Sequence, residues 1–404
     1  MAAVLEAREE RVVHPVSNAE LERRWSAVRA KMRDQGIDAL LVSGCQDWMN
    51  GNIRWFTGLP AHNGYPRSAV FPVDGLMTVV EQGAFGVEQN IQAPETATRG
   101  VGRKLYTPSY PGGVAYTGGY DAELLAKDIL KQGFKTVGLV CAEGMYYGIA
   151  HGVMERCKGL KFVDASELVD SIKSVKSAEE LDLVRAAAAM QDLAMKKVQE
   201  HVKPGMKDFE VAAYAQYIGQ LNGSEQGIFL CSSAPPGKPA QFRPRTQQAR
   251  TMQKGDTFTL LIENNGPGGM FAELSRTFVL GKPSQELTDA LGHILEAQQH
   301  TLSLMKPGAS CKDIHASHNT FMRSRGLPEE KRLYSHGQGY DMVERPLVRQ
   351  DEPMKIQEGM NMVVHPGIMT DRVFMTNTDN YIIGKNGPGE CIHKTPKKVL
   401  EIAC

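Results

Sequence analysis

The sequence predicts an α/β protein of two domains, residues 1–173 and 174–404. Its 404 residues are enough to form two separate hydrophobic cores. Helical and extended patterns alternate along the first part of the chain, which is typical of an α/β domain. A polar joint at residues 174–180 precedes a long helical pattern, and the domain boundary is predicted there.

The first domain is predicted to begin with a helix over residues 19–35, because apolar residues recur there at helical spacing and Gly36 ends the pattern. The apolar run that follows, residues 37–42, predicts a buried strand. The remaining predicted strands cover residues 68–71, 76–81, 136–140 and 161–163, and the predicted helices cover residues 121–132, 145–157 and 166–172. Residues 112–119 contain four glycines and predict a flexible surface loop.

The second domain is predicted to begin with a long helix that ends near residue 201. Ser177, followed three residues later by Glu180, forms the capping box that starts this helix. The elements predicted after it are helices at residues 207–221, 285–305 and 310–325 and strands at residues 258–263 and 276–280.

The composition limits the classes of partner. Lys plus Arg and Asp plus Glu both total 46, so the net charge gives no reason to expect a nucleic acid or an anionic membrane as a partner. No stretch reaches the roughly 18 to 20 apolar residues of a membrane span, and the charged residues 1–15 are not a signal peptide. The seven cysteines are scattered without a Cys-x-x-Cys pair, which predicts reduced thiols in a cytoplasmic protein.

Five segments in the second half of the chain resemble, in order and spacing, the pita-bread superfamily of methionine aminopeptidase, aminopeptidase P, prolidase and creatinase. These segments are residues 255–258, 273–278, 335–339, 358–366 and 378–383. The Lys-Ser-Ala-Glu-Glu segment at residues 176–180 is also similar to the start of the pita-bread domain. The resemblance implies a creatinase-like small N-terminal α/β domain followed by a pita-bread C-terminal domain.

The peptidases of this superfamily hold two divalent metal ions with two Asp, one His and two Glu. The matching positions in this chain are Leu261, Glu273, His336, His365 and Thr378. Only His336 is of the residue type that the superfamily uses at its position, so the ligand set is incomplete. Glu263 is the carboxylate nearest to Leu261, and it shares the strand face of Leu261 because side chains alternate with period two.

The resemblance and the substitutions together predict an enzyme that cleaves a small organic molecule by general acid/base catalysis without a metal or other cofactor. His336, His365, Glu273 and Glu263 are the predicted catalytic residues, since a His–Glu pair places a base near neutral pH. A lyase, by elimination or retro-aldol cleavage, is favoured over a creatinase-like C–N hydrolase, because the loop that carries the creatinase His has Gln241 at the closest position.

Further residues are predicted to contact the substrate. Arginine binds carboxylates through two parallel hydrogen bonds, and Asp379 and Tyr381 are positioned to polarise a substrate hydroxyl. Arg67 lies in a segment that resembles the part of the creatinase small domain that reaches into the partner subunit's site. The predicted substrate-binding set is Arg243, Arg245, Arg345, Gln241, Asp379, Tyr381 and Arg67.

Two alternatives stay open at this point. One is a metal-dependent, Xaa-Pro aminopeptidase-like hydrolase in which a single Zn²⁺ or Fe²⁺ is held by Glu263, Glu273, His336 and His365. The other is a non-catalytic binding protein. Relatives with both domains are commonly homodimers, so a homodimer that binds a small-molecule substrate is expected.

Overall fold

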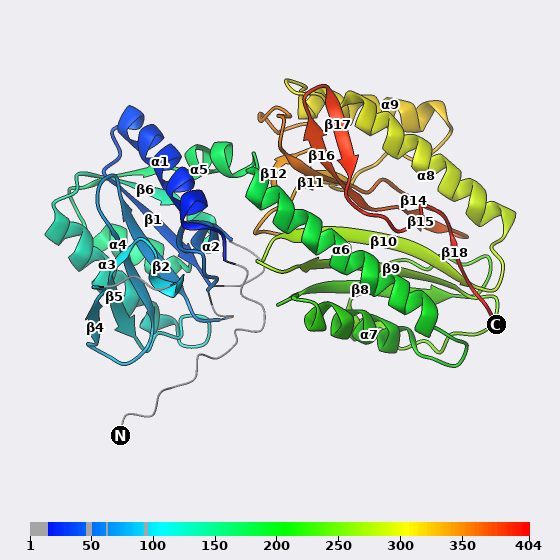
Figure 1. The fold of residues 1–404 in the computed structure, drawn as a ribbon, viewed down its shortest axis with the longest axis horizontal. Coiled ribbons are helices and arrows are strands. Elements are labelled where there is room, and N and C mark those ends of the chain that lie inside the picture. The colour runs from blue at the N-terminus through cyan, green and yellow to red at the C-terminus, as the bar shows by residue number, and fades with distance from the viewer. Residues whose placement is uncertain (1–14, 46–50, 62–63, 93–95) are drawn as a thin grey trace. The chain divides into compact units, whose positions relative to one another are not determined.

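The computed structural model describes residues 15–45, 51–61, 64–92 and 96–404. It divides into two compact units, Pro15–Ser174 and Val175–Cys404, each with its own sheets and helices (Figure 1). The predicted α/β class is confirmed. The prediction about a signal peptide concerns residues 1–15, of which all but Pro15 lie outside the described residues. No helix within the described ranges is long and apolar enough to cross a membrane.

The unit Pro15–Ser174 is built on one seven-stranded sheet, whose order is β4-β5-β3-β2-β1-β6-β7. Its strands are β1 (Ala39–Gly44), β2 (Arg67–Pro72), β3 (Met77–Gln82), β4 (Glu88–Asn90), β5 (Val101–Thr107), β6 (Thr136–Val140) and β7 (Lys161–Asp164). Its helices are α1 (Asn18–Gln35), α2 (Asn52–Thr57), α3 (Gly118–Gln132), α4 (Tyr147–Arg156) and α5 (Ser166–Lys173). Apolar side chains of α3 and α4 pack on one face of the sheet and form its core there.

The glycine-rich stretch at residues 112–119 differs from the predicted flexible loop. It contains a short 3-10 helix, Ala115–Thr117, and the first two residues of α3. A Cβ atom on Gly118 would lie 3.6 Å from the Cα of Gly148, and one on Gly152 would lie 2.7 Å from the Cβ of Ala122. Glycines here therefore allow α3 and α4 to approach closely.

The unit Val175–Cys404 contains a four-stranded sheet, β18-β10-β9-β8, a five-stranded sheet, β12-β11-β13-β16-β17, and the hairpin β14-β15. The strands are β8 (Gly227–Ala234), β9 (Thr257–Asn265), β10 (Phe271–Leu280), β11 (Ser335–Gly337), β12 (Glu344–Leu347), β13 (Asn361–Val364), β14 (Gly367–Met369), β15 (Phe374–Thr376), β16 (Asp379–Gly384), β17 (Gly387–Cys391) and β18 (Leu400–Ile402). A bridge between Ser275 and Thr378 joins the two larger sheets.

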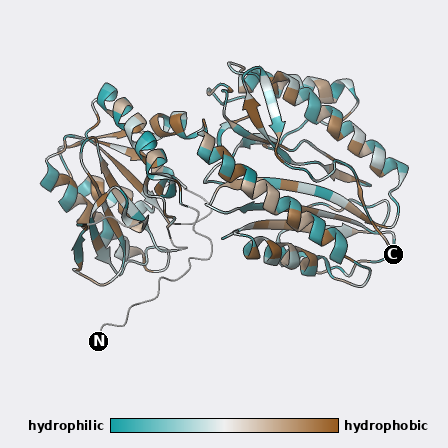
Figure 2. Ribbon diagram, in the orientation of Figure 1, coloured by the Kyte–Doolittle hydropathy of each residue, from teal (hydrophilic) through white to brown (hydrophobic). Residues whose placement is uncertain are grey.

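Four helices cover these sheets: α6 (Ala178–His201), α7 (Asp208–Leu221), α8 (Gln285–Leu304) and α9 (Cys311–Ser324). The predicted capping box is present, since the Ser177 side chain accepts from the backbone N–H of Glu180 and the Glu180 side chain accepts from that of Ser177. Apolar side chains of α6 and α7 pack against the four-stranded sheet, and α8 and α9 contribute to the core beside the five-stranded sheet. The helices carry both hydrophilic and hydrophobic stretches, as expected for helices with one face in a core (Figure 2).

Candidate metal centre

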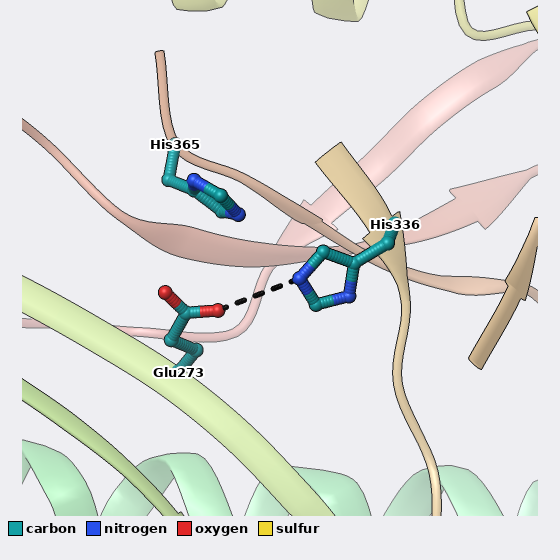
Figure 3. Close-up of side chains that lie close together, drawn as sticks. All are labelled: Glu273, His336 and His365. Atoms are coloured by element: carbon teal, nitrogen blue, oxygen red, sulfur yellow. Dashed lines mark ion pairs between the residues drawn. The ribbon is translucent and has the colours of Figure 1, made fainter. Parts of the chain in front are cut away.

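Three side chains from different strands meet where the four-stranded and five-stranded sheets approach each other. Glu273 is the third residue of β10, His336 lies in β11, and His365 directly follows β13. One potential ligand atom of each lies within 4.8 Å of the other two, and the three side chains point toward one another (Figure 3). The Nε2 atom of His336 is 3.8 Å from Oε2 of Glu273, and the two imidazole rings have centroids 5.4 Å apart.

The backbone fixes the orientation of His336. Its Nδ1 atom lies 2.9 Å from the carbonyl oxygen of Gly337, which only accepts, so Nδ1 carries the proton. The Nε2 lone pair is then free on the side of Glu273. Burial lowers the pKa of His336 to about 4, which keeps the ring neutral. A neutral imidazole whose second nitrogen donates to a backbone carbonyl is the usual form of a metal-binding histidine.

Two of the potential ligand atoms are buried without a hydrogen bond. Oε2 of Glu273 and Nε2 of His365 have no partner among the residues that the structure describes. Burial and the neighbouring Glu263 carboxyl raise the pKa of Glu273 well above its usual range, whereas burial and His336 lower the pKa of His365 well below its usual range. A divalent cation among the three atoms would satisfy both and supply the positive charge that Glu273 lacks. The donor set therefore fits a metal ion.

Glu263 lies on β9 directly opposite Glu273 on β10, so the two side chains share one face of the sheet. It is 6% exposed, and its Oε1 atom accepts a hydrogen bond of 3.0 Å from Nε2 of Gln338. Burial raises the pKa of Glu263 to about 8, and its carboxyl is hydrogen-bonded to that of Glu273. Glu263 is not one of the three clustered ligand residues, so it lies beside the cluster as the cross-strand neighbour of Glu273.

The two other positions that resemble ligand positions of the superfamily provide no carboxylate. Leu261 is apolar and 5% exposed, and it pairs with Ser275 across the β9–β10 hairpin. The hydroxyl of Ser275 donates to that of Thr378 at 2.6 Å, and both residues are buried. The hydrogen bond between Ser275 and Thr378 thus lies at the position where a second metal ion would need a carboxylate ligand.

A buried amide network supports the acidic side of the site. Asn380 Oδ1 accepts from the backbone N–H of Glu273, and Asn380 Nδ2 donates to Gln338 Oε1. Asn361 donates to the backbone carbonyl of Gln338. The sequence analysis did not identify these amides as part of the site. Their positions in the sequence could have indicated them. Gln338 lies two residues after His336, and Asn380 lies on β16, the strand that pairs with β13.

Three of the predicted substrate-binding residues make contacts with other side chains of the protein. The guanidinium of Arg345 binds Glu352 at 2.6 Å. Asp379 is fully buried and forms an ion pair of 2.7 Å with Arg276, and the Tyr381 hydroxyl donates to Oε1 of Gln298.

The other four lie outside the cluster of ligand residues. Arg243 and Gln241 are exposed, and the side chain of Arg245 donates to that of Gln216. Arg67, in the N-terminal unit, forms a 2.6 Å ion pair with Glu81. Within the described ranges, these seven residues have no hydrogen bond or ion pair with Glu273, His336 or His365, and their roles at a substrate stay predictions.

The chain is similar to known proteins over both units. The sequence profile of Metallopeptidase family M24 matches residues 182–387, about half of the chain, and that of the Creatinase/Prolidase N-terminal domain matches residues 24–175. A hydrolase/peptidase of Sinorhizobium fredii, y4tM, is 27% identical over 96% of this chain and 99% of its own length. An Xaa-Pro dipeptidase of Pyrococcus horikoshii is 23% identical over 67% of this chain and 76% of its own length.

Among solved structures, the X-Pro aminopeptidase of Thermotoga maritima superposes with a TM-score of 0.77 at 18% identity, covering 94% of this chain and 99% of its own. At that identity the likeness shows the fold alone. Together with the profile matches, it confirms the predicted resemblance to the pita-bread superfamily.

These comparisons contradict the predicted metal-independent mechanism. The prediction of a lyase or creatinase-like hydrolase working without a cofactor is wrong, because the family profile that matches this chain is that of a metallopeptidase family, and the similar proteins include Xaa-Pro dipeptidases. The physical reason lies in the substitutions themselves. His365 replaces one ligand by another, since imidazole and carboxylate both bind transition metals, and Glu273 retains a carboxylate. The three residues that remain could therefore still hold a metal ion.

Proposed function

The chain belongs to metallopeptidase family M24 and is an enzyme of that superfamily, and from this premise we propose that it is a metal-dependent hydrolase of a peptide or related amide bond. We further propose that one divalent ion is held by Glu273, His336 and His365. The activity of the named dipeptidase relatives supports the reaction class.

One observation carries this proposal. The ligand atoms of Glu273, His336 and His365 lie within 4.8 Å of one another, and two of them are buried without a hydrogen bond in the described part of the chain. Three protein ligands with open coordination positions are the usual arrangement of a catalytic zinc site. A merely structural cluster would have its buried polar atoms paired with each other.

When bound, a divalent ion at such a site polarises a carbonyl oxygen and makes water acidic enough to act as a nucleophile near neutral pH. The residues of the chain would bind the ion, orient the ligands and supply a proton. His336 and His365 bind as neutral rings, and the Gly337 carbonyl holds His336 in orientation. Burial raises the pKa of Glu263 to about 8, so this residue holds a proton near neutral pH, and we propose that it supplies this proton to the leaving amine.

The number of ions follows from the replaced positions. A second ion in this superfamily needs the carboxylates that Leu261 and Thr378 replace. Here an apolar side chain and a hydroxyl bound to Ser275 stand at these positions. Bridging two cations requires several anionic oxygens, so we propose a single-ion site.

The test is the metal content of the purified protein, reconstituted separately with Zn²⁺, Mn²⁺ and Co²⁺ and freed of excess ion. We expect one ion per chain, and hydrolysis of Xaa-Pro dipeptides that is lost after chelation and restored by the ion. His365→Ala and Glu273→Ala should weaken ion binding by more than the roughly 10- to 100-fold typical of losing an outer-shell partner.

His300→Ala is the matched control, because His300 is a partly buried histidine whose Nε2 contacts Ser317 outside the cluster. It should keep the ion content of the parent protein. A protein that binds no ion under these conditions would contradict the metal site, and two ions per chain would contradict the single-ion proposal.

We also propose a small substrate and a homodimer, on the basis of the superfamily resemblance and the dipeptidase relatives. Light scattering of the eluted protein tests the dimer. A monomer at micromolar concentration would contradict it.

A further inference from the structure

Arg332 lies at the edge of the candidate metal centre. It precedes His336 by four residues, and its Nη2 atom is 3.5 Å from the backbone carbonyl oxygen of His365. Its side chain is 49% exposed, so the guanidinium is open to solvent on one side. It was not among the arginines that the sequence analysis selected for anion binding.

The guanidinium is held firmly on its other side. Nε and Nη2 of Arg332 donate to the two carboxylate oxygens of Glu330 at 3.0 and 2.6 Å. Glu330 is 5% exposed, and its backbone N–H and carbonyl are both bound by the side chain of Asn319. Such a bidentate pair restricts the orientation of the guanidinium plane. The position of Arg332 is therefore defined before any substrate binds.

Gly367 provides the space for this arrangement. A Cβ atom on Gly367 would lie 2.4 Å from Nη2 of Arg332. The backbone N–H of Gly367 also donates to Glu330. The guanidinium thus covers a glycine two residues after His365, which keeps it beside the metal-binding loop.

One terminal nitrogen of the Arg332 guanidinium is not used in these contacts. Nη1 of Arg332 makes no hydrogen bond to any residue in the described ranges, since its interactions with Glu330 and His365 use Nε and Nη2. One edge of a fixed, half-exposed guanidinium is thus available beside the cluster.

We propose that Arg332 binds an anionic group of the substrate, most simply a carboxylate close to the bond that is cleaved. Arginine presents parallel N–H donors that match the two oxygens of a carboxylate. Because the guanidinium contacts the backbone of His365, whose ring belongs to the cluster, we expect the bound anionic group to belong to a short substrate. This inference rests on the proposed hydrolase for the identity of the site, but anion binding is measured independently of turnover.

The test compares two probes that differ only in charge, N-acetylglycine and N-acetylglycinamide, by calorimetric titration into protein loaded with Mn²⁺. We expect the parent protein to bind the carboxylate roughly 10- to 100-fold more tightly than the amide, as charge-assisted hydrogen bonds allow. In Arg332→Gln this preference should fall nearly to one, and in Arg332→Lys it should be partly kept, since the charge remains.

Arg349→Gln is the matched control. Arg349 also pairs with an acidic residue two positions later, Asp351, and its side chain is likewise 49% exposed. This variant should keep the full preference. Metal content and thermal unfolding of each variant separate loss of the probe site from loss of the fold.

An unchanged preference in Arg332→Gln would overturn the proposal and would mean that the ion alone binds the carboxylate. Absence of any preference in the parent protein would overturn it as well. If the parent protein holds none of Zn²⁺, Mn²⁺ and Co²⁺, the proposed function fails, and the same titration of the metal-free protein still decides whether Arg332 binds the anion.

Discussion

The donor atoms of Glu273, His336 and His365 decide which ions the site favours. Two imidazole nitrogens and one carboxylate oxygen suit Zn²⁺, Fe²⁺ and Co²⁺ better than Mg²⁺ or Ca²⁺, which prefer oxygen ligands throughout. The exchange of a carboxylate for His365 also removes one negative charge from the site. At the residue scale, the proposed metal site of this chain therefore differs from the superfamily's site in the types of its ligand residues and in its net charge.

Two buried aspartates on α3 give a residue-scale prediction about pH. Burial raises the pKa of Asp121 to about 6, from an ordinary 3.8, whereas Asp128 is paired with Arg103 and Gln132. Between about pH 4 and 6 the folded state binds more protons at Asp121 than the unfolded state, so stability falls as the pH rises through this range. Asp121→Asn should remove this fall and raise the free energy of unfolding at pH 7 by up to roughly 3 kcal/mol.

Urea unfolding followed by tryptophan fluorescence measures this, because Trp25, Trp48 and Trp55, the three tryptophans of the chain, all precede residue 174. Asp128→Asn is the control on the same helix and should lower stability, since it breaks the pair with Arg103. Equal pH slopes for the parent protein and Asp121→Asn would refute the assignment.

At the scale of elements, the β9–β10 hairpin and α6 together place the acidic side of the site. Gln191 of α6 donates to the backbone carbonyl of Ala272, next to Glu273, and to the side chain of Asn264 beside Glu263. The turn of the hairpin lies against the helix, because a Cβ atom on Gly266 would lie 2.5 Å from the Cα of Ala187.

Gly266→Ala should therefore separate the hairpin from α6. Since the contact is with backbone atoms of Ala187, no side-chain rotation relieves it, and we expect a loss of about 1–3 kcal/mol in the free energy of unfolding together with weaker ion binding. Gly292→Ala in α8 is the control: a Cβ atom there meets nothing within 4 Å. It should be neutral or stabilising by up to about 1 kcal/mol. Chemical denaturation followed by circular dichroism compares the two variants. Equal free energies of unfolding would show that the contact between Gly266 and Ala187 does not contribute to stability.

The sequence predicted the long elements better than the short ones. The helices with clear caps and stops, such as α1 and α6, lie within a residue or two of their predicted bounds. The strands β11 to β15 have only three or four residues each, too few for a periodic pattern. β10 was predicted only from residue 276. The whole strand is buried on both faces, so no alternation of apolar and polar residues marks where it begins.

The residues of the candidate site could be predicted where they lie in segments whose order and spacing resemble the superfamily. Glu273, His336 and His365 were placed by their segments, and Glu263 by strand periodicity. Arg332 and Glu330 were not found, since their role depends on a loop that folds back onto Gly367, thirty-five residues after Arg332. The loss of metal inferred from the substitutions was wrong because ligand chemistry, unlike residue identity, is preserved by His365.

At the scale of the whole molecule, the two units have separate hydrophobic cores. All three residues of the proposed metal site lie in Val175–Cys404, so ion binding should stabilise that unit alone. The gain is about 2.7 kcal/mol when the free ion is at 100 times its Kd. Calorimetry with and without a chelator should show one transition that shifts, while the tryptophan-reported transition of the other unit stays in place. A metal-dependent shift of the tryptophan signal would contradict this.

The hydroxyl contact between Ser275 and Thr378 has a kinetic corollary. With that position filled, each chain passes from empty to complete in one step, without a half-loaded species. Activity should then rise as a simple hyperbola with free ion, free of any lag or sigmoid onset, and turnover per bound ion should be the same at every degree of loading.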